Sequence, residues 1–274
     1  MSEVETIKKI EEKSSPLTIT SLKAEFRELG LKPGMTLLLH SSLSSLGWVC
    51  GGAVAVILAI EEILGTDGTL VVPTFSTNLS DPSNWHNPPV PESWWAAIRQ
   101  EMPHYDRDFT PTRGVGVIPE TFRKQNGVIR SNHPHISFAA WGKYAQIITD
   151  NHTLDYPFGD GSPLARIYGL DGWIVLLGTS YSSNSSFHLA EYRAEYSGKI
   201  VEHHHAPLLV NGCRKWQEME DYKSFDGDFN DIGASFEKDC PGKTHISMIG
   251  KSITRLIRQR DLVDYAVSWL SHKH

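Results

Sequence analysis

The chain has 274 residues, of which 40% are apolar, and its 32 acidic and 26 basic side chains leave a net charge of −6. This length supports one large domain with a substantial core. The negative charge argues against a nucleic-acid partner or an anionic membrane surface, and it favours a cationic small-molecule ligand. Three isolated cysteines, Cys50, Cys213 and Cys240, indicate neither a disulfide framework nor a cysteine metal site.

The N-terminal third predicts a parallel βαβ unit behind a loose leader. Residues 1–16 are charged and lack the apolar core of a signal peptide, and no apolar run reaches the ~18 residues that span a bilayer, so a cytoplasmic location is expected. A helix at 19–29 is followed by an apolar strand at 35–39, a helix at 53–64 and a second strand at 69–72. This order implies a right-handed parallel crossover.

Residues 76–112 interrupt this rhythm with a composition rich in Pro, Asn, Asp and Trp. We interpret them as an insertion in a single domain that spans 1–274, with one short helix around 94–102 beside a cleft. A helix near 116–125 and a strand around 136–141 are predicted to follow it.

The C-terminal half begins with a buried strand at 173–177, which runs into a turn of small polar residues. Two half-polar strands, 199–210 and 214–222, then meet at the turn Asn211-Gly212 and indicate an antiparallel extension. A helix ends the chain. The whole pattern predicts an α/β fold with a central mixed sheet that has a parallel core.

The most informative segment is the turn at 178–187 together with the helix start that follows it. Open α/β sheets bind ligands beyond the carboxyl ends of their strands, and the imidazole of His188 is suited to take a proton near neutral pH. On a helix, Glu191, Tyr192 and Glu195 would share one face with this histidine. We expect His188 to be catalytic with Glu191 beside it. A structural histidine, or a zinc ligand that lacks a third partner, is the alternative.

A second candidate is the loop of small residues at 40–52, between the first strand and its helix. Small residues let a ligand approach the backbone, and the amide groups of a helix start favour an anion. Neither a P-loop nor a Gly-x-Gly-x-x-Gly dinucleotide motif occurs there, and a plain connecting loop is the alternative. Arg113, which small residues follow, could hold a phosphate or lie on a solvated turn.

Other histidines carry weaker signals. His133 and His135 flank a proline without a nearby carboxylate, so a structural role, or one imidazole facing the cleft, is favoured over zinc binding. The run His203-His204-His205 lies in a strand whose neighbours alternate sides, so these rings cannot converge on one ion, and we place them on the surface. No Gly-x-Ser-x-Gly nucleophile elbow occurs in the sequence.

Five groups of motifs occur across roughly residues 20–270. They are His40-Ser-Ser-Leu-Ser-Ser-Leu-Gly47 with Gly51-Gly52, Gly68-Thr-Leu-Val-Val-Pro-Thr-Phe75, Arg130-Ser-x-His133-Pro, Ser162-Pro163, and Asn184-Ser-Ser-x-His188-Leu-Ala-Glu191. In this order they resemble the aminoglycoside 3-N-acetyltransferase family, the antibiotic N-acetyltransferases that use acetyl-CoA. Ser185 and Phe187 depart from the Thr and Leu that the resistance enzymes tend to carry.

The resemblance implies a three-layer α/β/α fold, unrelated to the GNAT acetyltransferases, and direct transfer of acetyl from acetyl-CoA to an amine in a ternary complex without a metal. It implies that His188 is the general base, with Glu191 beside it, and that Thr110 and Arg113 lie near the CoA phosphates. The loop along the pantetheine arm would comprise His40, Ser41, Ser42, Leu43, Ser44, Ser45, Leu46 and Gly47. The acceptor side would be lined by Phe75, His133, Asp160 and Glu191.

Physical chemistry agrees with these implied roles. An aminoglycoside amine is mostly protonated at neutral pH, so a neutral histidine within about 3 Å is needed to accept a proton from it. The expected acceptor is the 3-amino group of a 2-deoxystreptamine aminoglycoside, and a homodimer is the oligomer considered. The alternatives are a CoA-binding relative without aminoglycoside activity and a metal-dependent hydrolase that uses His133, His135, His188 and Glu191.

Overall fold

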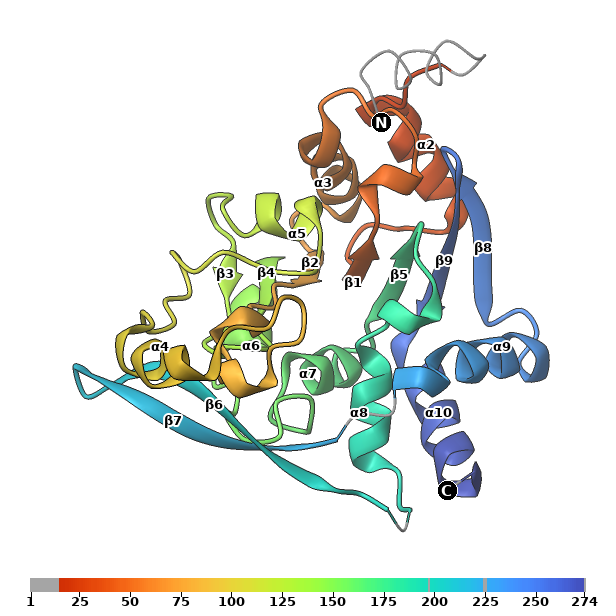
Figure 1. Cartoon of the computed structure of the whole chain (residues 1–274). Coiled ribbons are helices and arrows are strands. Elements are labelled where there is room, and N and C mark those ends of the chain that lie inside the picture. The colour runs from red at the N-terminus through yellow and green to blue at the C-terminus, as the bar shows by residue number, and fades with distance from the viewer. Residues whose placement is uncertain (1–14, 197, 224–225, 274) are drawn as a thin grey trace.

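The computed structural model describes residues 15–196, 198–223 and 226–273 (Figure 1). All but the last two residues of the predicted leader therefore lie outside the described part. At the centre is a seven-stranded mixed sheet with the order β3-β4-β2-β1-β5-β9-β8. Its strands are β1 (Thr36–Ser41), β2 (Thr69–Pro73), β3 (Ile129–Arg130), β4 (Phe138–Gly142), β5 (Trp173–Leu177), β8 (Thr244–Ile249) and β9 (Ser252–Arg258).

The parallel core forms where the sequence predicts it. β1 runs parallel to β2 on one side and to β5 on the other, with Leu38 opposite both Val71 and Ile174. These three strands are apolar and almost wholly buried, as expected for strands that are covered on both faces. The pairs β2–β4, β3–β4, β5–β9 and β8–β9 are antiparallel, so the sheet is mixed.

Helices cover both faces of the sheet, which gives the predicted three-layer α/β/α fold (Figure 1). They are α2 (Ile19–Leu29), α3 (Gly52–Leu64), α5 (Val117–Phe122), α6 (Ala145–Thr149), α7 (Pro163–Gly169), α8 (Ser186–Arg193), α9 (Phe229–Asp239) and α10 (Gln259–Lys273). Leu37 and Leu39 point into a core shared with α2, α3 and α5, whereas Leu38 points into a core shared with α6 to α10. Within the described ranges, no helix combines the length and apolarity needed to cross a bilayer.

Local sequence signals set the helix boundaries. Thr18 and Ser21 cap the start of α2 reciprocally, and Gly30 ends this helix in the left-handed conformation. At the start of α7, the Ser162 hydroxyl accepts a hydrogen bond from the amide of Ala165, and Pro163 occupies the first helical position. The helix ends at 30 and 65 that the glycines predict are therefore confirmed.

A long hairpin lies outside the central sheet. Its strands β6 (Val201–Val210) and β7 (Cys213–Tyr222) pair around Asn211-Gly212 as predicted, but they form a separate two-stranded sheet. They do not extend the central sheet, whose antiparallel strands are β3, β4, β8 and β9. The reason is that half-polar strands suit a ribbon with an exposed face better than a buried sheet. The hairpin packs against the insertion instead, where Arg214 donates to the backbone oxygens that end α4 (Trp95–Glu101).

Arg130 ties the insertion to the sheet. Its guanidinium is buried, at 3% exposure, and donates to the carbonyl oxygens of Thr74 and Thr110 and to the hydroxyl of Ser137. Burial lowers the pKa of this guanidinium. These partners lie in segments that are distant in the sequence, so this one side chain fixes where residues 76–112 begin and end relative to β2 and β4.

Candidate active site

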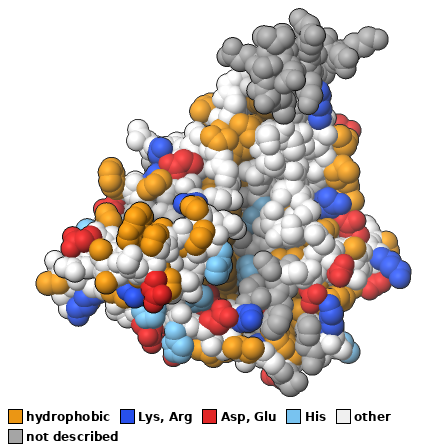
Figure 2. Space-filling view, in the orientation of Figure 1, with side chains coloured by type: hydrophobic (Ala, Val, Ile, Leu, Met, Phe, Trp, Pro, Cys, Tyr) orange, Lys and Arg blue, Asp and Glu red, His pale blue; other side chains and the backbone are white. Residues whose placement is uncertain are grey.

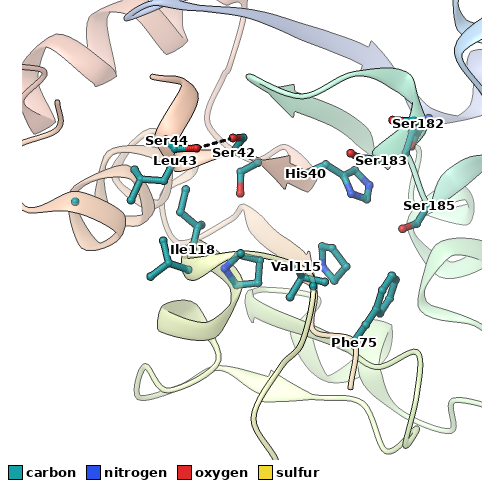
Figure 3. A pocket seen from close by; sticks show the side chains of 18 of the residues that line it. His40, Ser42, Leu43, Ser44, Phe75, Val115, Ile118, Ser182, Ser183 and Ser185 are labelled. Carbon is teal, nitrogen blue, oxygen red and sulfur yellow. Dashed lines mark hydrogen bonds between the residues drawn. The ribbon is translucent and has the colours of Figure 1, made fainter. Parts of the chain in front are cut away.

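The carboxyl ends of the three parallel strands open into one cavity of about 740 Å³, which we call the first chamber (Figure 3). β1 ends in the loop at 40–52, which we call the serine-rich loop. β2 leads to Phe75, and β5 leads to the turn before α8. Open α/β sheets bind ligands at this edge, where the strand order changes direction. The chamber is lined by His40, Ser41, Ser42, Leu43, Ser44, Gly47, Trp48, Val49, Gly52, Pro73, Phe75, residues 114–119, residues 182–185 and His188.

The wall of the first chamber combines apolar side chains with serine hydroxyls, two imidazoles and one amide, and its described lining residues include no Lys, Arg, Asp or Glu. The first residue of the 13-residue helix α3, Gly52, is part of this wall, so the amide end of a long helix borders the cavity. Three buried atoms on the wall have no hydrogen-bond partner within the protein: His40 Nε2, Ser41 Oγ and Asn184 Nδ2. Unpaired buried polar groups are costly, so the wall suits a ligand with hydrogen-bonding groups.

Gly178 lets β5 leave the sheet beside the serine-rich loop. Its φ of +63° lies in the left-handed region, and a Cβ at this position would lie 2.0 Å from Ser45 Oγ and 2.8 Å from Ser252 Oγ. A larger residue would therefore push the loop away from the strand end. The close approach fixes the spacing between the loop and the turn that leads to His188.

His188 and Glu191 form the pair that their spacing predicts. Both lie on α8, with His188 Nδ1 2.7 Å from Glu191 Oε2. The Glu191 side chain is 4% exposed, whereas the His188 side chain is 18% exposed and lines the first chamber. Phe158 stacks on the imidazole with a centroid distance of 4.3 Å, and Phe229 meets it edge-on at 4.9 Å. The carboxylate and the two rings together set the orientation of the imidazole.

His40 lies at the end of β1 and projects into the chamber near Ser183 (Figure 3). Burial, assisted by the positive charge of His188 when that residue is protonated, lowers the pKa of His40 to about 3. This imidazole is therefore neutral at physiological pH, when one ring nitrogen can donate and the other can accept a hydrogen bond. His40 can orient a polar ligand there without adding charge to the chamber.

A second chamber of about 700 Å³ lies between the insertion and the hairpin. Three carboxylates belong to its wall, those of Glu202, Glu220 and Asp221. Tyr192 donates a hydrogen bond to Asp221, and burial raises the pKa of that carboxyl, which also interacts electrostatically with His188. The other lining residues are Thr77, Ser80, Asn84, His86, His133, His135, Ile136, Leu154, Pro157, Val201, His203, His204 and Met219.

Two buried histidines, His133 and His135, belong to the wall of the second chamber. Figure 2 shows histidine side chains within the hollow at the centre of the face that it draws. His133 Nδ1 accepts hydrogen bonds from the amides of His135 and Ile136, and His135 Nε2 lies 3.2 Å from the carbonyl oxygen of Leu79. Burial, together with the neighbouring His152 and His135, lowers the pKa of His133. In the described part of the chain, no three His, Cys, Asp or Glu residues are placed to hold a metal ion.

Several predicted residues lie away from the first chamber. Ser45 and Leu46 belong to the loop at 40–52 but are not among the residues that line the chamber, and the Ser45 hydroxyl donates to the carbonyl of Ser42. The Thr110 hydroxyl accepts a hydrogen bond from the amide of Asp106, while Arg113 is exposed next to the lining segment 114–119.

Two further predicted residues lie outside both chambers. Asp160, expected on the acceptor side, is not among the lining residues of either chamber; it pairs with Arg193, and its side chain is 81% exposed. Because α8 ends at Arg193, Glu195 lies beyond the helix and not on the face of His188 as expected.

Four residues at or beside these chambers receive no site role in the sequence analysis. Phe158 stacks on His188, and an aromatic residue directly before Gly159-Asp-Gly is the signal in the sequence that could have indicated a ring against the site. Asn184 enters the sequence analysis only as part of a motif. His203 and His204 line the second chamber, although their polar strand indicated a surface position, because the strand pattern alone does not show what packs above it.

The sequence model of the family described as aminoglycoside 3-N-acetyltransferase matches residues 38–271. The chain is 44% identical over 265 residues to the SPbeta prophage-derived aminoglycoside N(3')-acetyltransferase-like protein YokD of Bacillus subtilis (strain 168), with 96% of each chain covered. It is 35% identical over 271 residues to aminoglycoside N(3)-acetyltransferase VII of Streptomyces paromomycinus, with 94% of this chain and 93% of the relative covered.

Solved structures agree over nearly the whole chain. The crystal structure of the YokD protein from Bacillus subtilis has a TM-score of 0.93 at 42% identity and covers 97% of both chains. The AAC-IIIb binary complex with CoASH has a TM-score of 0.84 at 27% identity, covering 94% of this chain and 98% of that one. AAC-VIa bound to sisomicin has a TM-score of 0.85 at 28% identity, covering 95% and 100%. The chain therefore belongs to the aminoglycoside 3-N-acetyltransferase family of acyltransferases.

Proposed function

We propose that this chain transfers the acetyl group of acetyl-CoA to an amine of an aminoglycoside-like polycation, the 3-amino group of a 2-deoxystreptamine ring, with His188 as the general base. The observation that carries the proposal is the His188–Glu191 pair at the wall of the first chamber. Its 2.7 Å contact supports a tautomer in which Nδ1 donates to the carboxylate, which leaves Nε2 to take up the proton. The buried carboxylate stabilises the imidazolium that forms when His188 takes a proton.

His188 alone can carry out both proton transfers that the reaction requires. The acceptor ammonium first loses one proton to water through His188. The neutral nitrogen then attacks the thioester carbon, a C–N bond forms, and the π electron pair moves to the carbonyl oxygen. His188 takes a second proton from the nitrogen, the C–S bond breaks as the oxyanion collapses, and the leaving thiolate receives that proton. The products are the N-acetylated amine and CoA thiol.

The first chamber supports the proposal as the site of the acetyl-CoA arm. The pantetheine arm carries amides but no charge, and the lining residues offer serine hydroxyls, backbone at Gly47 and unpaired buried polar atoms but no charged side chain. The CoA phosphates would remain at the rim, where Arg113 is exposed and where the methylene chain of Lys251 lies against Gly47. One of the structural relatives is a complex with CoASH.

The second chamber supports the proposal as the acceptor site. An aminoglycoside is a polycation, and Glu202, Glu220 and Asp221 bring three carboxylates to this wall. Asp221 interacts electrostatically with His188, and Pro157, next to the ring stacked on His188, also lines the chamber. An acceptor held here would have an amine within reach of the base while its other ammonium groups face carboxylates. One of the structural relatives is bound to sisomicin.

The test is a thiol-release assay with acetyl-CoA across a panel of 2-deoxystreptamine aminoglycosides and simple polyamines. We expect acceptor-dependent release of CoA thiol with at least one aminoglycoside, with the acetyl group located by mass spectrometry and NMR on the 3-amino nitrogen. Tight CoA binding without release for any acceptor would instead identify a non-catalytic CoA-binding relative. Release with polyamines alone would contradict the proposed acceptor class.

A further inference from the structure

The turn that leads into α8 holds a buried amide whose donor half has no partner within the protein. Asn184 is 0% exposed and lies on the wall of the first chamber, four residues before His188. Its Oδ1 accepts a hydrogen bond from the backbone amide of Ser186 at 3.2 Å. This contact fixes the amide orientation, because a backbone N–H must meet the oxygen and not the NH₂ group. Asn184 Nδ2 has no hydrogen-bond partner among the protein atoms.

The position of this amide is tightly held. The Asn184 backbone amide donates to the carbonyl oxygen of Tyr181, and the Asn184 carbonyl accepts from the amide of Phe187. The turn is therefore hydrogen-bonded on both sides of the asparagine, and its side chain is buried among packed neighbours. A buried donor without a partner costs about 1–3 kcal/mol, and the described residues supply no partner for this one. A ligand in the chamber can supply the missing acceptor.

Two further unpaired atoms belong to the strand next to β5. His40 Nε2 and Ser41 Oγ belong to β1, which pairs with β5 immediately before the turn that carries Asn184. Both residues line the same chamber. Among the described residues, three of the eight buried side-chain atoms without a hydrogen-bond partner therefore belong to the wall of the first chamber, where the reacting end of the cosubstrate would lie.

We propose that the side-chain amide of Asn184 donates a hydrogen bond to the carbonyl oxygen of the bound acetyl thioester and stabilises the negative charge that develops there. This inference rests on the proposed function and names a group that contacts the reacting atoms. During attack, the π electron pair of the thioester carbonyl moves to oxygen, and a donor fixed in advance stabilises that charge without reorganising. Base and donor are then four residues apart in the sequence, and both belong to the wall of the first chamber.

The experiment compares three ligands that differ at one group: acetyl-CoA, S-ethyl-CoA, which lacks only the carbonyl oxygen, and CoA. Their affinities are measured by calorimetry without an acceptor for the unaltered protein, Asn184→Asp and Asn184→Leu. Asn184→Asp retains the oxygen that binds the Ser186 amide, while Asn184→Leu removes the donor without adding charge. Binding of CoA and the thermal unfolding midpoint show whether each variant is folded.

We expect both variants to bind acetyl-CoA about 5-fold more weakly, the value of one hydrogen bond of ~1 kcal/mol, and S-ethyl-CoA and CoA with unchanged affinity. The kcat for transfer should fall about 10²–10³-fold, because the contact strengthens as the oxyanion forms. Equal losses for the three ligands would assign Asn184 to pantetheine binding or to folding and overturn the proposal. A loss confined to Asn184→Asp would assign the effect to its new charge and also overturn it.

These results separate this inference from the proposed function. The binding comparison needs neither an acceptor nor turnover. If the unaltered protein prefers acetyl-CoA over S-ethyl-CoA in a manner that depends on Asn184, the contact is supported even when no amine is acetylated, and only the proposed transferase function fails. If transfer occurs at an unchanged kcat in both variants, the transferase function stands and the role of Asn184 is overturned.

Discussion

The two chambers differ in both chemistry and construction. The first lies at the ends of the buried parallel strands, and its described lining includes no charged side chain apart from histidines that can titrate. The second lies between the insertion and the β6–β7 hairpin, and its lining includes three carboxylates and five histidines. One is thus part of the core of the fold, while the other is formed where two peripheral segments meet.

This difference indicates a division of labour. A chamber built on central strands cannot change shape without disturbing the core, which suits a ligand that stays the same, such as acetyl-CoA. A chamber built from a loop segment and a ribbon can change its charges and outline at little cost to the core. His188 connects them, because it lines the first chamber and interacts with Asp221 of the second.

The largest expected effect comes from removing that connection. His188→Ala should lower the rate of acetyl transfer about 10²–10⁴-fold, because the variant lacks the imidazole proposed to accept the amine proton. The affinity for CoA should change little, since the serine-rich loop and the ends of the strands remain. Thiol release and calorimetry measure the two quantities separately. Glu191→Gln should reduce the rate less, since Glu191 acts through the imidazole. A variant without His188 that retained full turnover would refute the assignment of the base.

The first chamber could be largely predicted from the sequence. Apolar runs bounded by glycine or small residues mark β1, β2 and β5, and the ends of parallel strands meet at one edge of a sheet. The pair on α8 could be predicted as well, since residues three apart share a helix face. Both inferences use only neighbours in the sequence, together with one rule of α/β topology.

The second chamber could not be predicted in the same way. Its walls come from residues within 77–86, 133–157 and 201–221, which meet only after the chain has folded. A half-polar strand pattern shows that one face is exposed, but not which segment packs on the other, so His203-His204-His205 could be placed only on the surface. β8 and β9 also went unpredicted, because the mostly half-exposed or exposed residues of β8 lack a strong apolar run.

Acid should lower the stability that the buried histidines contribute at and behind the wall of the second chamber, where His152 packs against His133. Burial lowers the pKa of His135 and of His152 to about 4, compared with an unfolded value of about 6.5. The unfolded chain therefore binds more protons below pH 6.5, so the stability these residues contribute is complete above that pH and is lost as the pH falls toward 4. Between pH 7 and pH 5, each residue should lower the free energy of unfolding by roughly 2 kcal/mol.

Urea unfolding at pH 7 and pH 5 measures this loss. His152→Gln, which can still hydrogen-bond to Ser131 and to the carbonyl of Pro157, should reduce the difference between the two pH values by roughly 2 kcal/mol. His245→Gln is the matched control, because His245 is exposed on β8 and should leave the difference unchanged. An equal pH dependence in both variants would show that the buried imidazoles do not control acid stability.

The smallest expected effect tests whether the second chamber attracts the acceptor by charge. Glu202 lines it, and its side chain is 42% exposed. An exposed ion pair of this kind contributes about 0.2–1 kcal/mol, so Glu202→Gln should raise the KM for an aminoglycoside roughly 2–5-fold without changing the KM for acetyl-CoA.

Glu218→Gln is the control, because this carboxylate lies on the same hairpin, pairs with His203 and His205, and is not among the lining residues. Because salt screens exposed charges, the Glu202 effect should shrink at high ionic strength. An equal rise in KM for both variants would mean that the net charge of the hairpin, and not the chamber wall, attracts the acceptor.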